Sequence, residues 1–403
     1  MNFIDFLYIF FATLVLYFTF IFLILFSRNK KDFSKVPKIK KLPSVSIIVP
    51  AYNEEKNIGS VIKNLKKLKY PKKLLEIIVV DDGSTDKTAE IAEKNGAKVI
   101  RKEKGGKASA LNIGLKHAKS EIIACIDADS YPKKNALIEA VPFFVDKDVA
   151  AVTTRIFTKK KNKILEKFQS IEYAMIAWSR KLFEYIEGVY VTPGPLSLYR
   201  KSVVEKIGGF DEKNLTEDIE IAWRILSNGY KIKMSPAKTY TEIPRSFKKW
   251  WKQRLRWNIG GIQTFIKYRK SMFKKGSESF GFFIVPFFAL SYFLSLLALS
   301  IFLYLIYIWA FNNILFYISA YSVGLNPIKR VSQLFMPDLF TIFGVLIFIL
   351  SIVIVNTGLK TMGYQRNFKT WFYILLYLTI YITIFPLILV HSLIKMAKGY
   401  KEW

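Results

Sequence analysis

The sequence predicts an α/β domain with a mostly parallel sheet, placed between apolar helices that cross a membrane. Between residues 45 and 275, short apolar runs alternate with amphipathic stretches, which is the order of strands and helices around a parallel sheet. Long apolar runs lie before and after this region, and 52% of the 403 residues are hydrophobic. That share favours a polar domain joined to membrane segments over a wholly soluble protein.

The strands are expected at the short buried runs and the helices at the amphipathic stretches between them. The expected strands are Val45–Val49, Glu76–Val80, Ile122–Ile126 and Val149–Thr153. The expected helices are Lys56–Leu68, Thr85–Asn95 and Lys107–His117. Because ligands bind at the carboxyl ends of such strands, the polar residues that follow them are the first candidates for a site.

The first membrane span is expected at Phe3–Phe26, where Asp5 is the only charged residue. A run of about 20 apolar residues crosses a bilayer as a helix. A secretory signal peptide is the competing interpretation, which is disfavoured because the run is too long, no basic residue precedes it and no small-residue cleavage site follows it.

Further spans are expected near the other end of the chain. Phe282–Trp309, Leu339–Val355 and Trp371–Leu389 are each long and apolar enough, and Asn312-Asn313 is expected to end the first of them. Ile314–Val323 is too short to cross alone, which predicts an interfacial or re-entrant segment. Three spans after the polar domain are therefore expected, with four as the alternative.

The distribution of charge predicts how the polar domain is oriented at the membrane and which classes of partner to expect. The formal net charge is +30, and basic residues are dense at Arg28–Lys41, directly after the first span. Such a cluster places the polar domain in the cytoplasm of a multi-pass plasma-membrane protein, beside the lipid bilayer. Basic residues next to membrane spans are usually cytoplasmic, but three later spans would place Lys395 and Lys398 outside the cell. A fourth later span removes this conflict. No zinc-finger or basic-zipper pattern is present, so no nucleic-acid partner is expected.

The chain is expected to divide into four parts. These are a membrane helix at 1–27, a cytoplasmic catalytic domain at 28–245, amphipathic interfacial helices at 246–279 and a membrane region at 280–403. Tryptophan among basic residues favours a membrane-surface position for Ser246–Tyr268. Ile164–Phe183 is equally compatible with a core-facing helix and an interfacial one.

Four polar motifs stand out, three at the ends of expected strands and the Gly-Gly-Lys motif before the last of these three. They are Val49–Glu55, Val79–Asp86, Lys104–Ala108 and Ile126–Ser130. Each alone is also typical of an ordinary turn or helix start. The carboxylates of the last motif are hard oxygen ligands that suit Mg²⁺ or Mn²⁺. The Gly-Gly-Lys motif lacks the spacing of a P-loop and indicates only a contact with nucleotide or phosphate.

Taken together, these motifs resemble the family 2 glycosyltransferases, whose catalytic domain has the GT-A fold. Gly194–Arg200 is similar to the acceptor-side loop of hyaluronan and chitin synthases, and Thr216–Asp218 to the family's catalytic-base motif. Gln253–Trp257 is similar to the Gln-x-x-Arg-Trp motif of the membrane-bound, often processive members, which include cellulose synthases. The resemblance covers residues 44–260 by motif and the remainder by architecture.

The resemblance implies a role for each residue that matches a motif. Asp218 is implied to be the general base, and Asp129 the ligand of Mg²⁺ or Mn²⁺. The residues implied to bind the donor are Pro50, Tyr52, Glu54, Asp82, Lys107, Asp127, Gln253 and Arg256. The residues implied to bind the acceptor are Trp257, Glu217, Gly194 and Pro195.

The implied function is an inverting transfer of a sugar from a nucleotide-sugar donor to a growing polysaccharide at the membrane. A UDP-hexose or UDP-N-acetylhexosamine is the expected donor. Ceramide glucosyltransferases also resemble this pattern, so single-sugar transfer to a lipid acceptor is the alternative. A non-catalytic membrane scaffold is a third hypothesis, which the intact set of acidic residues disfavours. The sequence does not indicate the oligomeric state.

Overall fold

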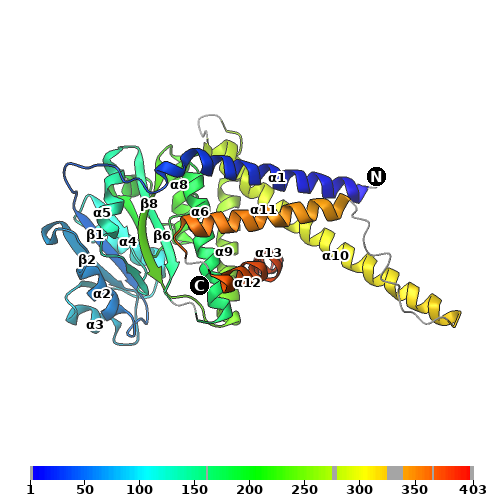
Figure 1. Cartoon of the computed structure of the whole chain (residues 1–403). Coiled ribbons are helices and arrows are strands. Elements are labelled where there is room, and N and C mark those ends of the chain that lie inside the picture. Colours follow the sequence, from blue (N-terminus) through cyan, green and yellow to red (C-terminus); the bar gives the residue numbers. More distant parts are fainter. Residues whose placement is uncertain (1–2, 160–161, 275–278, 325–338, 365–366, 400–403) are drawn as a thin grey trace.

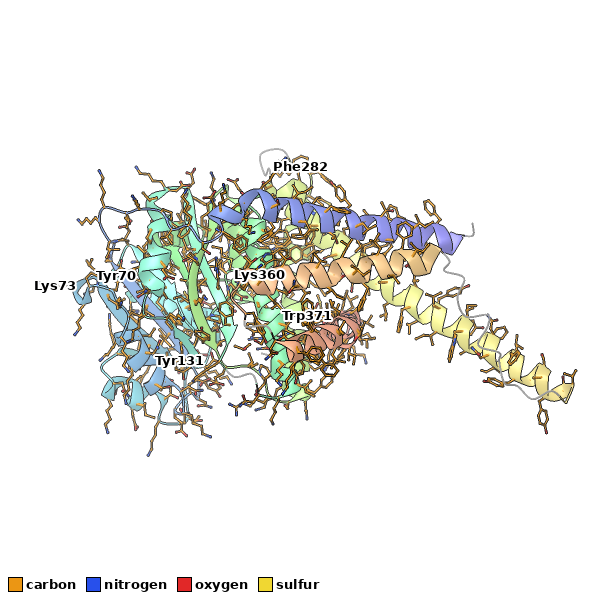
Figure 2. All side chains as sticks on the ribbon, in the orientation of Figure 1. Tyr70, Lys73, Tyr131, Phe282, Lys360 and Trp371 are labelled. Carbon is orange, nitrogen blue, oxygen red and sulfur yellow. The ribbon has the colours of Figure 1, made fainter. Side chains whose placement is uncertain are left out.

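The computed structural model describes residues 3–159, 162–274, 279–324, 339–364 and 367–399. An α/β domain forms one end of the molecule, and apolar helices extend from it to the other end (Figure 1). Figure 2 labels Lys73 at the far side of this domain and Lys360 where a long apolar helix meets it. The polar and membrane-like parts are therefore separate in space, as the sequence predicts.

The α/β domain contains one eight-stranded sheet in the described part of the chain. Its strand order is β3-β2-β1-β4-β7-β6-β8-β5. The strands are β1 (Val45–Ala51), β2 (Leu75–Asp81), β3 (Lys98–Arg101), β4 (Ile122–Cys125), β5 (Ser130–Pro132), β6 (Val149–Thr158), β7 (Ser197–Arg200) and β8 (Lys231–Thr241).

The sheet is mixed, which corrects the expectation of a mostly parallel one. β3, β2, β1 and β4 are parallel, whereas β7 runs antiparallel to both β4 and β6, and β5 runs antiparallel to β8. β6 and β8 are parallel to each other. A strand that is buried on both faces is apolar throughout whichever way it runs, so the sequence pattern carries no sign of direction.

Two apolar layers cover the faces of the sheet. Along β1, Ile47 and Val49 contribute to the cluster that includes α2, while Ile48 contributes to the cluster that includes α4. Alternate residues of a strand point to opposite faces, so one apolar strand supplies both layers. The helices of the domain are α2 (Ile58–Lys66), α3 (Thr88–Lys94), α4 (Lys107–His117), α5 (Ala136–Ala140), α6 (Ile164–Glu184), α7 (Lys201–Lys206), α8 (Glu217–Ser227) and α9 (Phe247–Tyr268).

Long apolar helices extend away from the domain (Figure 1). In the described residues, four segments are long and apolar enough to cross a membrane, namely Phe6–Asp32, Phe280–Ser322, Ile342–Thr361 and Phe368–Ala397. They correspond to α1 (Phe3–Asn29), α10 (Val285–Ser322), α11 (Leu339–Thr361), and α12 (Phe368–Leu376) with α13 (Phe385–Ala397). α1 lies beside α11, and α13 lies beside α9 (Figure 1).

The prediction that Asn312-Asn313 ends a helix is wrong. α10 continues through both residues to Ser322, so Ile314–Val323 is not a separate segment. The Asn313 side-chain amide donates to the Trp309 carbonyl at 2.6 Å, one turn earlier in the same helix. Asparagine can therefore be accommodated because its polar group bonds back to its own helix.

α6 and α9 connect the domain to the apolar helices. α6 packs between β6 and α11, and α9 packs between α8 and α13. Trp178 of α6 and Trp250 of α9 are almost fully buried in one cluster that includes residues of α11. Both helices are thus held by the protein interior on one side, and the membrane-surface position of Ser246–Tyr268 stays a prediction.

Candidate active site

A cavity of about 580 Å³ lies among the sequence motifs, at the carboxyl ends of β1, β2 and β4. Here the strand order reverses, because the chain passes from β1 outward to β3 and returns to β4 on the other side of β1. Open α/β sheets bind ligands at such a point. α6, α9 and the loop before β7 close the other side of the cavity.

The structure brings the separate motifs together around this cavity. All but one of the residues predicted from the sequence lie in its wall. They are Pro50, Tyr52, Glu54, Asp82, Lys107, Asp127, Asp129, Gly194, Pro195, Asp218, Gln253, Arg256 and Trp257. Glu217 is 5% exposed and lies behind the wall, at a small adjoining space that Lys107 and Asp127 also line.

Asp82 holds the glycine loop in place. Its carboxylate accepts the backbone N–H groups of Gly105 at 2.9 Å and Gly106 at 2.8 Å, and it also accepts from the Lys102 ammonium. Gly106 has φ +90°, a conformation that glycine adopts without strain. Because both amide groups already donate to Asp82, they are not free to hold a phosphate, unlike the arrangement that the Gly-Gly-Lys motif suggested.

Lys107 joins three elements at the floor of the cavity. Its ammonium lies 2.7 Å from Asp127 Oδ1 and 2.9 Å from Glu217 Oε1. Although burial lowers the pKa of Lys107, the two carboxylates hold it well above its ordinary value. A Cβ atom on Gly194 would lie 2.5 Å from the Lys107 ammonium and closer still to the Asp127 carboxylate, so this approach requires glycine at position 194.

Asp218 and Glu217 begin α8, and their pKa values are shifted in opposite directions. Burial, and then the charge of Glu217, raise the pKa of Asp218 to about 7 against the opposing effects of Lys107 and Arg256. Burial would also raise the pKa of Glu217, but the contact with Lys107 holds it below its ordinary value. Asp218 is therefore balanced between its two protonation states near neutral pH, which suits proton transfer.

Asp127 and Asp129 fit the binding of a divalent cation with help from a ligand. In the described part of the chain, no three His, Cys, Asp or Glu side chains are grouped so that they could hold a metal ion by themselves. Burial, and then the charge of Asp127, raise the pKa of Asp129 to about 6. Ser130 and Thr241 donate to Oδ1 of Asp129 at 3.1 and 3.2 Å, which leaves Oδ2 for a cation. Asp127 is already paired with Lys107.

α9 presents Gln253, Arg256 and Trp257 to the cavity, since residues three and four apart share one face of a helix. Arg254 is not part of the cavity wall, and its Nε donates to Glu172 Oε1 at 3.0 Å. The Arg254 guanidinium also lies 4.2 Å from the centre of the Trp257 ring. A buried ion pair therefore supports the aromatic wall from behind.

Comparison with known proteins identifies the domain. Residues 46–208 match the model of the family described as Glycosyl transferase family 2. The chain contains a family 2 glycosyltransferase domain. The match includes the three motifs that follow β1, β2 and β4, and also the loop with Gly194.

Two relatives extend the likeness beyond the glycosyltransferase domain. The chain is 34% identical over 268 residues to the probable glycosyltransferase YdaM of Bacillus subtilis (strain 168). It is 35% identical over 260 residues to the poly-beta-1,6-N-acetyl-D-glucosamine synthase of Staphylococcus aureus (strain COL). Each alignment covers 62% of this chain and 62% of the relative, so the chain spans less than two thirds of either.

One solved structure resembles nearly the whole chain. It is the mannosyltransferase PcManGT from Pyrobaculum calidifontis, determined in complex with GDP-Man and Mn²⁺. The TM-score is 0.57 with 21% identity, over 96% of this chain and 97% of the other. At this identity the likeness concerns the fold, and it confirms that the glycosyltransferase domain is GT-A-like.

The sequence motifs missed the part of the cavity that α6 supplies to the glycosyltransferase domain. Tyr173, Ile176 and Arg180 line the cavity at a spacing of three and seven residues, which is one face of the helix. Tyr190, six residues beyond the end of α6, joins them. The spacing was visible in the sequence, but nothing in it distinguished a cavity face from a core face.

Proposed function

We propose that the protein is a metal-dependent, inverting glycosyltransferase that moves a hexosyl group from a nucleotide-sugar donor to a growing polysaccharide at the membrane. The observation that carries the proposal is the arrangement in one cavity of a carboxylate with a free oxygen (Asp129), a proton acceptor (Asp218) and a cation (Arg256). The family of the domain, and the names of the relatives from Bacillus subtilis and Staphylococcus aureus, support transfer of a sugar.

In the proposed reaction, an acceptor hydroxyl attacks the anomeric carbon as its bond to the diphosphate oxygen breaks. Asp218 takes the hydroxyl proton, and its pKa near neutrality lets it do so under cellular conditions. Attack opposite the leaving group inverts the anomeric centre. Arg256 and Gln253 stabilise the negative charge of the departing diphosphate.

Asp129 is the proposed ligand of the metal, with Asp127 facing the nucleotide. Mg²⁺ or Mn²⁺ bound there supplies positive charge to the diphosphate. The relative of known fold was determined with GDP-Man and Mn²⁺, which supports a divalent metal. Chelation of the metal should therefore abolish transfer.

The donor is proposed to be a UDP-hexose or a UDP-N-acetylhexosamine that lies along β1 and β2, against Pro50, Tyr52 and Glu54. The Staphylococcus aureus relative is named as a poly-beta-1,6-N-acetyl-D-glucosamine synthase, which favours the second of these. Asp82 and Lys107 shape this side of the cavity through the loop and ion pairs that they hold. Glu217 pairs with Lys107 and directly precedes Asp218 in α8, and it is proposed to act on the acceptor side.

The acceptor is proposed to bind against Trp257, Gly194 and Pro195, close to Asp218. A glycolipid synthase that adds one sugar to a lipid is the second candidate function. Its support is the apolar part of the cavity wall, where Ile176 belongs to a helix that packs against α11. Both functions use the same cavity and differ in the length of the product.

The domain is proposed to face the cytoplasm, with the four apolar helices spanning the plasma membrane. The basic cluster at Arg28–Lys41 supports this orientation. A cysteine placed at exposed Lys73, in a Cys125→Ser background, should resist an impermeant thiol reagent in intact cells and react after lysis. Labelling in intact cells would contradict the orientation.

One assay tests the function itself. The purified full chain in detergent is mixed with Mn²⁺ and each of a panel of UDP- and GDP-sugars, and release of the nucleotide is measured. We expect release from one or a few donors, and labelled donor then reveals whether the product is a polymer or a single glycoside. Absence of release from every donor by a folded protein would contradict the proposal and favour a scaffold.

A further inference from the structure

The cavity contains a buried cation that the proposed reaction does not use. Arg180 of α6 is 1% exposed and belongs to the cavity wall. It forms no ion pair with any residue that the structure describes. A buried charge without a partner is unfavourable, so a folded protein seldom keeps one without a use for it.

The contacts of the Arg180 guanidinium are all with neutral groups. Nη1 donates to Thr153 Oγ1 at 3.2 Å, and Nη2 donates to the Thr154 carbonyl at a long 3.4 Å. Nε has no hydrogen-bond partner among the described residues. Burial lowers the pKa of Arg180 to about 10, so the group keeps its charge at neutral pH.

A second buried arginine shows what a compensated charge looks like in this protein. Arg254 of α9 is also 1% exposed, but Glu172 accepts hydrogen bonds from both its Nε and its Nη2. Arg155, which is also buried and outside the cavity wall, has no carboxylate but donates two short hydrogen bonds, to Phe33 O at 2.7 Å and Ser34 Oγ at 2.9 Å. Arg180, in the cavity wall, has neither a carboxylate nor short hydrogen bonds among the described residues. This contrast indicates that the counter-ion of Arg180 arrives with a ligand.

The position of Arg180 assigns that ligand to the acceptor side. Arg180 belongs to α6, on the side of the cavity that α9 and the loop before β7 also close, whereas Asp127 and Asp129 follow β4 at the donor side. Asp218 does not serve as its partner, since in the described part of the chain the Arg180 guanidinium donates to Thr153 and Thr154 and forms no ion pair with Asp218. Tyr173 and Tyr190 add hydroxyl groups to the same wall, and hydroxyl groups can donate to an anion.

We infer that the acceptor carries an anionic group, a phosphate or a carboxylate, which pairs with Arg180 while a nearby hydroxyl faces Asp218. This inference rests on the proposed function, and it adds the chemical class of the acceptor. Arginine suits the task because its planar guanidinium binds phosphate and carboxylate with two parallel hydrogen bonds. An uncharged glycan would leave the buried cation without a counter-ion.

The first test measures binding without turnover. The full chain is purified in detergent and saturated with UDP or GDP, whichever binds more tightly, so that the diphosphate site is filled. Inorganic phosphate and methyl glucuronide are then titrated by calorimetry. We expect wild type to bind at least one of them, and Arg180→Met to bind it at least tenfold more weakly. Arg180→Lys should retain part of the affinity.

Thermal unfolding separates loss of a ligand contact from loss of the fold. Because Arg180 lacks a counter-ion in the free protein, Arg180→Met should unfold at the same temperature as wild type or higher. Arg245→Met is the matched control, since Arg245 is half exposed and lies outside the cavity. It should not change anion binding. Absence of anion binding by wild type, or equal binding by Arg180→Met, overturns the inference.

Two further arms identify the source of the anion. If the acceptor is a lipid phosphate, phosphatidic acid in phosphatidylcholine nanodiscs should compete with inorganic phosphate, whereas nanodiscs of phosphatidylcholine alone should not. If instead wild type cleaves UDP-glucuronic acid faster than UDP-glucose, and Arg180→Met loses this preference, the anion belongs to the donor and the acceptor assignment is overturned. Failure of the proposed function gives a different result, which is no nucleotide release from any donor.

Discussion

Tyr381 donates a hydrogen bond of 2.7 Å to Glu172, which links the last apolar segment of the chain to α6. The Tyr381 hydroxyl also accepts from Trp250 Nε1 at 2.7 Å, and Glu172 pairs with Arg254. All four side chains are buried. Since Trp250 and Arg254 belong to α9, this network fixes the helix that carries Gln253 and Trp257 against both α6 and the apolar helices.

Tyr381→Phe should therefore weaken both the fold and sugar transfer. The substitution leaves Trp250 Nε1 without its acceptor and Glu172 without one donor, and such a loss costs about 1–3 kcal/mol for a buried group. Thermal unfolding and transfer rate measure the two effects. Tyr377→Phe is the matched control, because Tyr377 is also buried and its ring stacks on that of Tyr381, with 5.4 Å between the ring centres. Equal effects of the two substitutions would show that the hydroxyl of Tyr381 has no special role.

Asp218→Asn should reduce transfer by about 10²–10⁴-fold, the usual contribution of a general base. The amide keeps the shape of the side chain but cannot accept a proton in this range, so affinity for the nucleotide should stay close to wild type. Glu212→Gln, on an exposed loop outside the cavity, serves as control. Near-normal turnover by folded Asp218→Asn would remove Asp218 from the reaction.

The pH dependence follows from the raised pKa of Asp218, which is about 7. The protonated form predominates below that value and cannot act as a base, so kcat/KM should fall as the pH decreases through neutrality and level off above it. The profile should be measured over a range in which circular dichroism shows the fold intact. A kcat/KM that is constant across neutral pH would contradict the assignment of Asp218.

The sequence predicts the strands and the positions of the motifs, but not how the motifs contact one another. β1, β2 and β4 begin within one residue of the predicted starts because each is a short apolar run with polar neighbours. Asp129 follows β4 and Asp218 begins α8, yet both line the same cavity. This meeting depends on packing between distant segments, which a local pattern does not encode.

Contacts between residues that are distant in the sequence explain why part of the site could not be predicted. Along the chain, Glu172 and Arg254 are 82 residues apart, and Lys107 and Glu217 are 110 residues apart. In its own stretch of sequence, each of these residues is typical of a charged residue on an amphipathic helix. Only the fold shows that one pair supports the aromatic wall and that the other organises the floor of the cavity.

Gly194→Ala adds only one methyl group, but it should impair transfer strongly. The new Cβ would enter the space occupied by the Lys107 ammonium and the Asp127 carboxylate, which are held close together by their ion pair. The pair must move, and nucleotide affinity should fall with it. Gly344→Ala is the control, since its Cβ would meet Tyr8 at an ordinary 3.4 Å. Calorimetry with the nucleotide distinguishes the two variants, and equal affinity would contradict the prediction.

Asp129→Ala should weaken both metal and donor binding, and EDTA should have the same effect on wild type. Oδ2 of Asp129 has no hydrogen-bond partner among the described residues, and hard oxygen atoms are the preferred ligands of Mg²⁺ and Mn²⁺. Donor affinity is measured with and without Mn²⁺. If chelation leaves transfer by wild type unchanged, the metal role of Asp129 is wrong.

Trp257→Ala should slow transfer strongly while nucleotide affinity stays close to wild type. Trp257 lines the cavity next to Arg256, packs against Tyr173 and is supported by the Arg254 guanidinium. Its ring can hold the apolar face of an acceptor sugar so that the hydroxyl lies near Asp218. A misplacement of about 1 Å can cost about 10²-fold in rate.

Hydrolysis of the donor by water provides the internal control for Trp257→Ala, because water needs no aromatic surface to reach the anomeric carbon. We therefore expect hydrolysis to fall less than transfer when both are measured with the same labelled donor. Trp257→Phe should recover part of the transfer rate, since it keeps an aromatic face. If nucleotide affinity collapses in Trp257→Ala while transfer at saturating donor survives, then Trp257 belongs to the donor side of the cavity.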